Sequence, residues 1–198
     1  MIKTIFFDFD GVIAPSKPGG RAIAEKLSLV IGVQEQRIFN AFKKVGRPYL
    51  LGKQSPKQFL EMLSKELEKQ VKVEDLVKAY YKVPISKQVL KIIEKLKARG
   101  HRVELVSNNP SFRFKALKAK GRIDVWKTFH KINISSLAGK MKEEFFQKLP
   151  LKEGLFIDNN KEFLERIKKK QGKTIYFDSL KHDLGYLKKK LAKAGIKA

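Results

Sequence analysis

The chain has 198 residues, 42% of them hydrophobic, and its 44 lysines and arginines against 20 aspartates and glutamates give a net charge of +24. It contains no cysteine, which excludes disulfides, thiolate metal sites and cysteine nucleophiles, and its three histidines lie too far apart for a local zinc motif. Any metal is therefore expected to be held by oxygen ligands, and the positive charge predicts an anionic partner.

Strands and helices alternate over most of the sequence. Residues 2–8 are apolar on both faces, as expected for a strand that is covered on two sides, and a second strand is expected at residues 102–109 after a helix that begins near Ser86. Three shorter strands and four further helices are predicted, the strands at 131–135, 154–160 and 174–178, and the helices near 111–119, 141–149, 161–170 and 182–194. This order predicts an α/β fold with a doubly wound, Rossmann-like parallel sheet.

A different pattern fills the stretch between the first two strands. Four helical segments are predicted there, with breaks at Gly32, 46–48 and 54–56, the segments being 20–31, 34–45, 56–69 and 73–82. We therefore expect a small all-helical domain of residues 16–82, inserted into an α/β core made of residues 1–15 and 83–198. Pro15 with residues 18–20 on one side, and residues 83–84 on the other, are the expected hinges.

Polar side chains follow the predicted strands at the points where the strands end. Asp8 and Asp10 follow the first strand, and Asp158 follows the fourth, while Ser107, Asn108 and Asn109 follow the second. Lys140 comes just beyond the third. Because the carboxyl ends of parallel strands meet at one edge of a doubly wound sheet, these residues are expected to converge on one pocket.

The motifs DFDGV, LVSNN, GKMKEEFF and FIDNN, taken in this order and spacing, resemble those of the haloacid dehalogenase superfamily, in its phosphatase branch with a helical cap between the first two motifs. The resemblance implies a phosphatase that uses Mg²⁺ and an aspartyl-phosphate on Asp8. Asp10 would be the acid and base, and its presence argues against a dehalogenase, which releases a halide and needs no proton donor there.

The resemblance also assigns the remaining site residues. Ser107 would hydrogen-bond a phosphoryl oxygen and Lys140 would stabilise the transferring group, with Lys142 as a second candidate for that lysine. The expected metal ligands are Asp8, Asp10 and Asp158. Substrate contacts are expected from Ser107 together with residues of the strand ends and the cap, namely Gly11, Arg47, Asn108 and Asn109.

The fourth motif departs from the usual pattern. Asn159 stands where a second aspartate is common, which would weaken metal binding, and Glu162 could compensate from the same helix face. Two alternatives therefore stay open beside a phosphatase of small metabolites. One is a phosphatase of nucleotides or nucleic-acid ends, suggested by the charge, and the other is a catalytically weak protein of the same fold that binds nucleic acid.

No apolar run approaches the roughly 20 residues that span a bilayer, and the N-terminus lacks the pattern of a signal peptide. We expect a soluble, cytoplasmic protein with no membrane partner.

Overall fold

The structure, a computed structural model, describes residues 2–17 and 20–197. Its centre is a five-stranded sheet in the order β3-β2-β1-β4-β5, in which every neighbouring pair is parallel. The strands are β1 (Thr4–Phe7), β2 (Arg102–Ser107), β3 (Lys131–Ile134), β4 (Gly154–Asp158) and β5 (Lys173–Tyr176). The predicted doubly wound α/β fold is confirmed, and each strand lies within two residues of its expected start.

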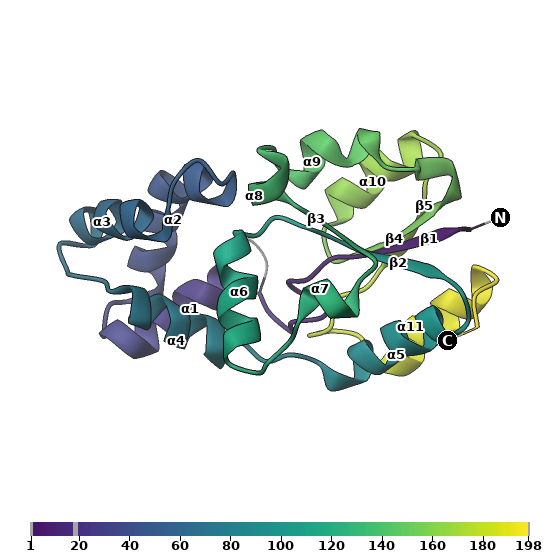
Figure 1. Cartoon of the computed structure of the whole chain (residues 1–198), viewed down its shortest axis with the longest axis horizontal. Helices are drawn as coiled ribbons and strands as arrows, with labels where there is room; N and C mark the ends of the chain where they lie inside the picture. The colour runs from purple at the N-terminus through teal and green to yellow at the C-terminus, as the bar shows by residue number, and fades with distance from the viewer. Residues whose placement is uncertain (1, 18–19, 198) are drawn as a thin grey trace.

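Helices cover both faces of this sheet (Figure 1). One face carries α9 (Lys142–Phe145), the 3₁₀ turn η1 (Phe146–Lys148) and α10 (Lys161–Lys169). The other carries α5 (Lys87–Ala98), α6 (Ser111–Ala119), α7 (Val125–Thr128) and α11 (Leu184–Lys193). Two short elements, α8 (Ser135–Ala138) and η2 (Leu151–Glu153), lie in the connections after β3 and before β4.

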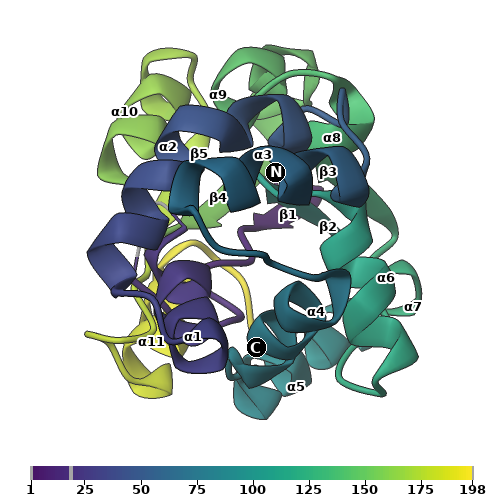
Figure 2. The ribbon, with the colours of Figure 1, turned by 90° about the vertical axis from the view of Figure 1, so that its left-hand side faces the viewer.

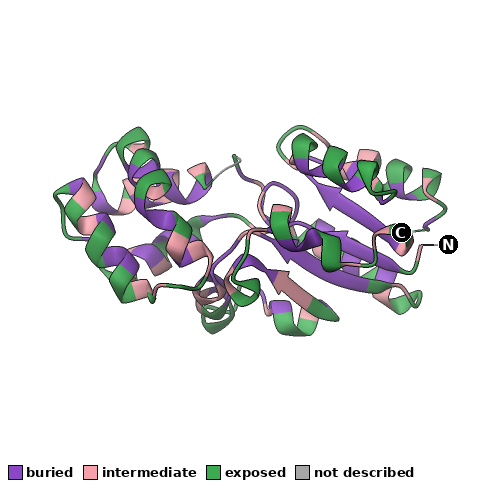
Figure 3. Cartoon of the chain, turned by 90° about the horizontal axis from the view of Figure 1, so that it is seen from above, coloured by how far each residue is buried: buried purple, intermediate pink, exposed green. Residues whose placement is uncertain are grey.

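The alternation of side chains along the strands divides the core into two layers. Phe6 faces α9 and α10 and stacks on Phe156, its partner in register on β4, with ring centroids 4.4 Å apart. Ile5 and Phe7 point to the opposite face and pack in the larger cluster with α5, α6 and α11. Figure 3 shows the three central strands β1, β2 and β4 almost entirely buried, which explains why their sequences are apolar on both faces, whereas the edge strands β3 and β5 are partly exposed.

The inserted helices form a cap at the end toward which the strands run (Figures 1 and 2). They are α1 (Arg21–Ile31), α2 (Glu35–Leu50), α3 (Pro56–Leu67) and α4 (Val73–Lys82). Each buries an apolar stripe against its neighbours, and α1 packs on both α2 and α4. Among the described residues, no helix combines the length and the apolar character that crossing a membrane would need.

The predicted break at residues 46–48 is wrong, because α2 continues through Gly46, Arg47 and Pro48 to Leu50. Pro48 lies near the end of the helix, where its missing N–H removes only one intrahelical bond close to solvent. The predicted helix at 141–149 is also shorter than expected, since α9 ends at Phe145 and passes into η1.

The two chain crossings between cap and core lie side by side. The N–H of Ser86 donates to the carbonyl of Ile13 at 2.8 Å and so ties the returning chain to the departing one. Of the expected hinges, Pro15 and residues 83–84 fall at these crossings, while residues 18–19 lie outside the described part of the chain.

The cap also contacts the core at the end of α2. The Ser135 hydroxyl donates to the carbonyl of Leu50 at 2.7 Å. Gly52 has φ +71°, and a Cβ atom added there would come within 2.3 Å of the Ser136 carbonyl oxygen. This approach requires glycine for two reasons, the left-handed conformation and the closeness of the core backbone.

We predict that Gly52→Ala destabilises the protein more than Gly100→Ala does. Both positions have a left-handed φ, so both substitutions should cost about 1–2 kcal/mol in conformational strain. Only Gly52 adds a clash with backbone, since a Cβ atom on Gly100 would meet no atom within 4 Å among the described residues. Free energies of unfolding from urea titrations check this, and equal losses would mean that the cap does not rest on Ser136.

Candidate active site

A cavity of about 780 Å³ lies between the cap and the carboxyl ends of the strands. The core contributes Asp8, Asp10 and Ser107 to its lining, and the cap contributes aromatic side chains, among them Phe42 and Tyr49. This volume is typical of sites for small molecules, and the convergence of the strand ends on one pocket occurs as the sequence predicted.

Asp8 is fixed by three donors from three parts of the chain. Its Oδ1 accepts from the Ser107 hydroxyl at 2.6 Å and from the N–H of Phe9 at 2.7 Å, and its Oδ2 accepts from the Lys142 ammonium at 2.7 Å. β1 holds the backbone in place, because the N–H of Asp8 donates to Ile157 on the adjacent β4. The side chain is buried yet borders the cavity, so its carboxylate is held in one orientation at the cavity floor.

The lysine of the site is Lys142, and the placement of Lys140 there is wrong. Lys142 is buried and its Nζ also contacts Asp158 Oδ2 at 2.6 Å, whereas Lys140 is exposed. Gly139, with φ +64°, ends α8 and turns the chain away, so that Lys140 points to solvent before Met141 begins α9. The motif spacing of the family, taken alone, did not distinguish Lys142 from Lys140, which lies two residues earlier.

Two carboxylates therefore share one buried ammonium. Burial would lower the pKa of Lys142, but the charges of Asp158 and Asp8 outweigh it and raise the pKa above its ordinary value. Burial and the nearby Asp8 charge raise the pKa of Asp158 to about 7, although the bond to Lys142 acts in the opposite direction. The three groups form one strongly interacting cluster, in which Lys142 stays charged.

Asp10 belongs to a second network that reaches away from Asp8. Its Oδ2 accepts from Asn109 at 2.9 Å and from Arg113 Nη1 at 2.7 Å. Asn109 also donates to the Ser107 hydroxyl at 3.0 Å, which joins the two networks. Asp10 Oδ1 is buried and has no hydrogen-bond partner among the described residues, so this oxygen is available to a ligand.

Arg113 is the site residue that sequence reasoning missed. It lies on the first turn of α6, a helix predicted only as part of the fold, and its side chain is only 2% exposed. Its position, six residues after Ser107 and one helical turn beyond the strand end, is the signal that could have identified it.

Asn108 positions the segment that carries the lysine. Its amide donates to both carboxylate oxygens of Glu143, and its Oδ1 accepts from the N–H of Lys142 at 2.7 Å. Both Asn108 and Asn109 border the cavity, as expected of substrate contacts, yet each already makes bonds that order the site.

Asp158 is placed differently from the expected metal ligand. One of its oxygens contacts Lys142 and the other accepts from the N–H of Asn160, and in the described part of the chain it is Asn159, not Asp158, that lines the cavity. Asn159 lies against Gly11, whose φ is +81° and where an added Cβ would come within 1.8 Å of the Asn159 amide nitrogen. Gly11 is thus required by its backbone and by this close contact, as the motif indicates.

The oxygen atoms that border the cavity fit a weakly bound Mg²⁺. They come from Asp8 and Asp10 and from the amide of Asn159, and the described residues hold no cluster of three or more His, Cys, Asp or Glu side chains able to bind a metal. Mg²⁺ is commonly held by one or two carboxylates, with water and substrate phosphate as the other ligands. Glu162 also borders the cavity, from α10.

Arg47 borders the cavity from the cap but is exposed. Its Nη2 contacts Glu144 Oε1 at 3.2 Å, which makes it a bridge from α2 to α9 on the core. An exposed pair of this kind contributes little to stability, so Arg47 can exchange Glu144 for a ligand at small cost.

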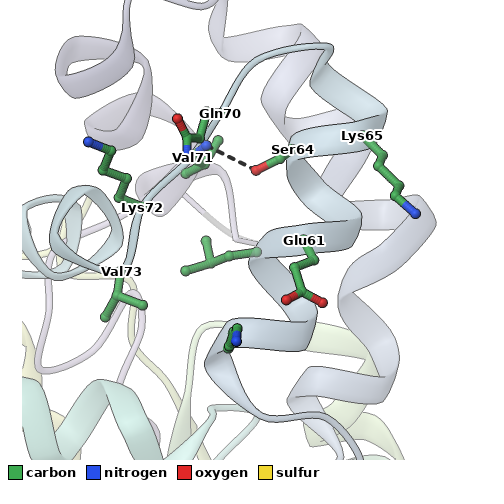
Figure 4. A pocket seen from close by; sticks show the side chains of 9 residues that line it. Glu61, Ser64, Lys65, Gln70, Val71, Lys72 and Val73 are labelled. Carbon is green, nitrogen blue, oxygen red and sulfur yellow. Dashed lines mark hydrogen bonds between the residues drawn. The ribbon is translucent and has the colours of Figure 1, made fainter.

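A second hollow, of about 400 Å³, lies on the cap between α3 and the chain leading into α4 (Figure 4). Its one hydroxyl, on Ser64, accepts from the N–H of Val71 at 2.9 Å, and its lining is otherwise apolar or made of single surface charges. The cavity between cap and core is therefore the place for chemistry.

Comparison with known families matches residues 2–162 to the haloacid dehalogenase-like hydrolases. No curated protein matches the sequence. A predicted HAD-like family hydrolase from Porphyromonas gingivalis has a similar structure, with 20% identity and a TM-score of 0.72 over 96% of this chain and 98% of that one.

Two further solved structures share the fold. A HAD family enzyme from Bacteroides thetaiotaomicron, in complex with magnesium and inorganic phosphate, is 21% identical with a TM-score of 0.75, over 94% of this chain and 99% of the other. The L-2-haloacid dehalogenase from Xanthobacter autotrophicus, with chloropropionic acid covalently bound, is 14% identical with a TM-score of 0.60, over 100% and 85%.

We predict that Lys142→Met and Lys140→Met, the same substitution at positions two residues apart, have very different effects on the stability of the protein. Lys142→Met leaves the carboxylates of Asp8 and Asp158 buried without a cation and should destabilise the protein by about 3–5 kcal/mol. Lys140→Met removes an exposed charge and should change stability by less than about 0.5 kcal/mol. Urea unfolding of both variants measures this, and a large loss from Lys140→Met alone would refute the assignment of Lys142.

Proposed function

Because the chain belongs to the haloacid dehalogenase-like hydrolases, we propose that it is a Mg²⁺-dependent phosphatase that removes phosphate from a small monoester through an aspartyl-phosphate on Asp8. The observation that carries the proposal is the setting of Asp8. Its carboxylate is held at the floor of the cavity by Ser107, Lys142 and a backbone N–H, and Asp10, whose Oδ1 has no partner among the described residues, borders the same cavity. The neighbour from Bacteroides thetaiotaomicron, which binds magnesium and phosphate, supports the same chemistry.

In the first step, an oxygen of Asp8 attacks the phosphorus atom and the bond from phosphorus to the ester oxygen breaks. The leaving alkoxide takes a proton from Asp10, so the alcohol departs neutral. In the second step, water attacks the phosphorus of the aspartyl-phosphate and gives its proton to Asp10, which releases inorganic phosphate and restores both carboxyl groups.

The Asp10 network suits this exchange of roles. Arg113 and Asn109 both bind Oδ2 and so fix the carboxyl plane, which leaves Oδ1 free to carry the proton. A group that must first give and then take a proton needs one oxygen free and a fixed orientation. Asp10 also favours a phosphatase over a dehalogenase, because only an alkoxide leaving group needs that proton.

Lys142 and Ser107 act on the transferring phosphoryl group. The Lys142 ammonium is next to Asp8 and stays charged, so it can offset the charge that spreads over the phosphoryl oxygens. The Ser107 hydroxyl, which now donates to Asp8, can turn its proton to a phosphoryl oxygen. Mg²⁺, held by Asp8, the backbone carbonyl of Asp10 and Asn159, would screen the repulsion between the carboxylate and the anionic ester.

The presence of the cap favours a small substrate over a large one. It covers the cavity and rests on the core through Leu50, Gly52 and Arg47, so the site is screened from water during transfer.

The first experiment measures phosphate release from an aryl phosphate, with and without Mg²⁺, for the protein and for Asp8→Asn. Asp8→Asn removes the nucleophile and should lower kcat by about three orders of magnitude or more. Ser16→Ala, which loses a bond to the Gly11 N–H beside the site, is a control for local disturbance. Activity that survives Asp8→Asn would refute the proposal, and running 5′-phosphorylated oligonucleotides in parallel tests the nucleic-acid alternative.

A second experiment tests the role of Asp10 by comparing leaving groups. Asp10→Asn should slow hydrolysis of an alkyl phosphate by about 10²–10⁴-fold, because an alkoxide leaves poorly without a proton. An aryl phosphate, whose phenolate leaves readily, should be affected far less. Values of kcat/KM for the two esters measure this difference, because they report the steps up to departure of the leaving group and not the later attack of water, in which Asp10 also acts. The same loss for both esters would mean that Asp10 has another role than proton donor.

A further inference from the structure

The guanidinium of Arg113 has one edge that the site described above does not use. Its Nη1 atom makes both bonds of the side chain, to Asp10 Oδ2 and to Asn109 Oδ1. Its Nε and Nη2 atoms are buried and have no hydrogen-bond partner among the described residues. These two nitrogens form one side of the guanidinium plane, where their N–H bonds run parallel and match the two oxygens of a carboxylate.

An unpaired charged donor of this kind is costly to bury. The side chain is 2% exposed, so water does not replace the missing partners, and a buried donor without an acceptor costs free energy that a ligand can recover. The other cations that border the cavity differ, since none of them has a buried nitrogen without a partner among the described residues: Lys17, Lys43, Arg47, Lys142 and Lys161.

The surroundings of this edge favour a flat anion. The guanidinium carbon lies 5.0 Å from the ring centroid of Phe9 and 5.6 Å from that of Tyr80, so aromatic faces border it. A planar carboxylate can lie in the plane of the guanidinium between such faces and pair with both nitrogens. The Tyr80 hydroxyl lies 3.4 Å from that of Tyr49, and burial raises the pKa of Tyr80 to about 12, so these hydroxyls remain neutral and can donate a hydrogen bond.

Arg113 also has a fixed relation to the reacting bond. Asp10, which would protonate the ester oxygen, contacts Arg113 at 2.7 Å. A group bound by Arg113 is therefore only a few bonds away from that ester oxygen, on the leaving-group side of the phosphorus.

We infer that Arg113 binds the carboxylate of the substrate through its Nε and Nη2 atoms, and that the substrate is the phosphate ester of a short hydroxy acid. The inference rests on the proposed function, because it takes the leaving group to lie between Asp10 and the cap. It makes Arg113 the residue that distinguishes carboxylated from neutral esters.

The test compares two phosphonates with the same three-carbon chain that the enzyme does not hydrolyse, 3-phosphonopropionate and propylphosphonate. They differ by a carboxylate in place of a methyl group. Calorimetric titration in the presence of Mg²⁺ should show that the protein binds 3-phosphonopropionate at least about tenfold more tightly, as expected for a charged bidentate contact. Inorganic phosphate is titrated as a reference for the phosphoryl site.

Two variants of Arg113 and one matched control locate the preference. Arg113→Gln should reduce the ratio of the two phosphonate affinities to near unity. Arg113→Lys keeps the charge but loses the pair of parallel N–H donors, so it should reduce this ratio to about threefold or less. Arg122→Gln removes an arginine of the core that does not border the cavity and contacts Tyr81 and the Val83 carbonyl instead, so it should leave the ratio of the two affinities unchanged. A purely positioning role of Arg113 toward Asp10 would alter both affinities together and leave their ratio unchanged.

The outcomes separate this inference from the proposed function. Equal binding of both phosphonates by the wild type, a ratio that survives Arg113→Gln, or a ratio lost in Arg122→Gln would each overturn the role of Arg113. Binding of inorganic phosphate without binding of either phosphonate would also overturn it, while leaving the phosphatase proposal intact. If neither phosphate binding nor aryl phosphate hydrolysis is found, the proposed function fails and the inference fails with it.

Discussion

The buried contact of Lys142 with Asp8 and Asp158 is the constraint on which the rest of the site depends. Two carboxylates at the ends of adjacent strands can be buried together only if a cation lies between them, and Lys142 supplies it at 2.7 and 2.6 Å. This contact joins β1, β4 and the start of α9, which are far apart in the sequence. The cluster carries one negative charge in excess only when both carboxylates are ionised, and burial together with the Asp8 charge raises the pKa of Asp158 to about 7.

The polar residues around this cluster are hydrogen-bonded to one another and hold the catalytic side chains in place. Asn108 holds the backbone of Lys142, and Asn109 joins Ser107 to Asp10, so two adjacent asparagines after β2 order the two halves of the site. This division explains why both carboxylate oxygens of Asp8 are hydrogen-bonded, whereas Asp10 Oδ1 has no partner among the described residues. Rigid support of this kind lets a site stabilise charge without reorganising during the reaction.

The cap gives the site its second wall and connects substrate choice to the chemistry. Its aromatic side chains form a compact cluster, in which Tyr49 stacks on Phe59 with ring centroids 4.4 Å apart, and Tyr80 extends this wall toward Arg113 on the core. Arg113 thus contacts the proton donor on one side and the cap on the other. A substrate that pairs with Nε and Nη2 of Arg113 would be recognised by the same guanidinium that orients Asp10. Substrate binding and proton transfer would then be coupled through this one side chain.

The sequence by itself determined the sheet, its helices, the insertion of the cap and most of the strand-end residues, because apolar periodicity and short motifs are local properties. Asp8, Asp10 and Ser107 lie together as predicted, since parallel strands bring their carboxyl ends to one edge. Only the tertiary structure decided that Lys142 and not Lys140 reaches Asp8, that Asn159 and not Asp158 borders the cavity, and that Arg113 belongs to the site. Each of these depends on where a turn directs a side chain across the fold, as at Gly139 with its φ of +64°, and that direction is set by contacts between segments distant in the sequence and not by the local pattern.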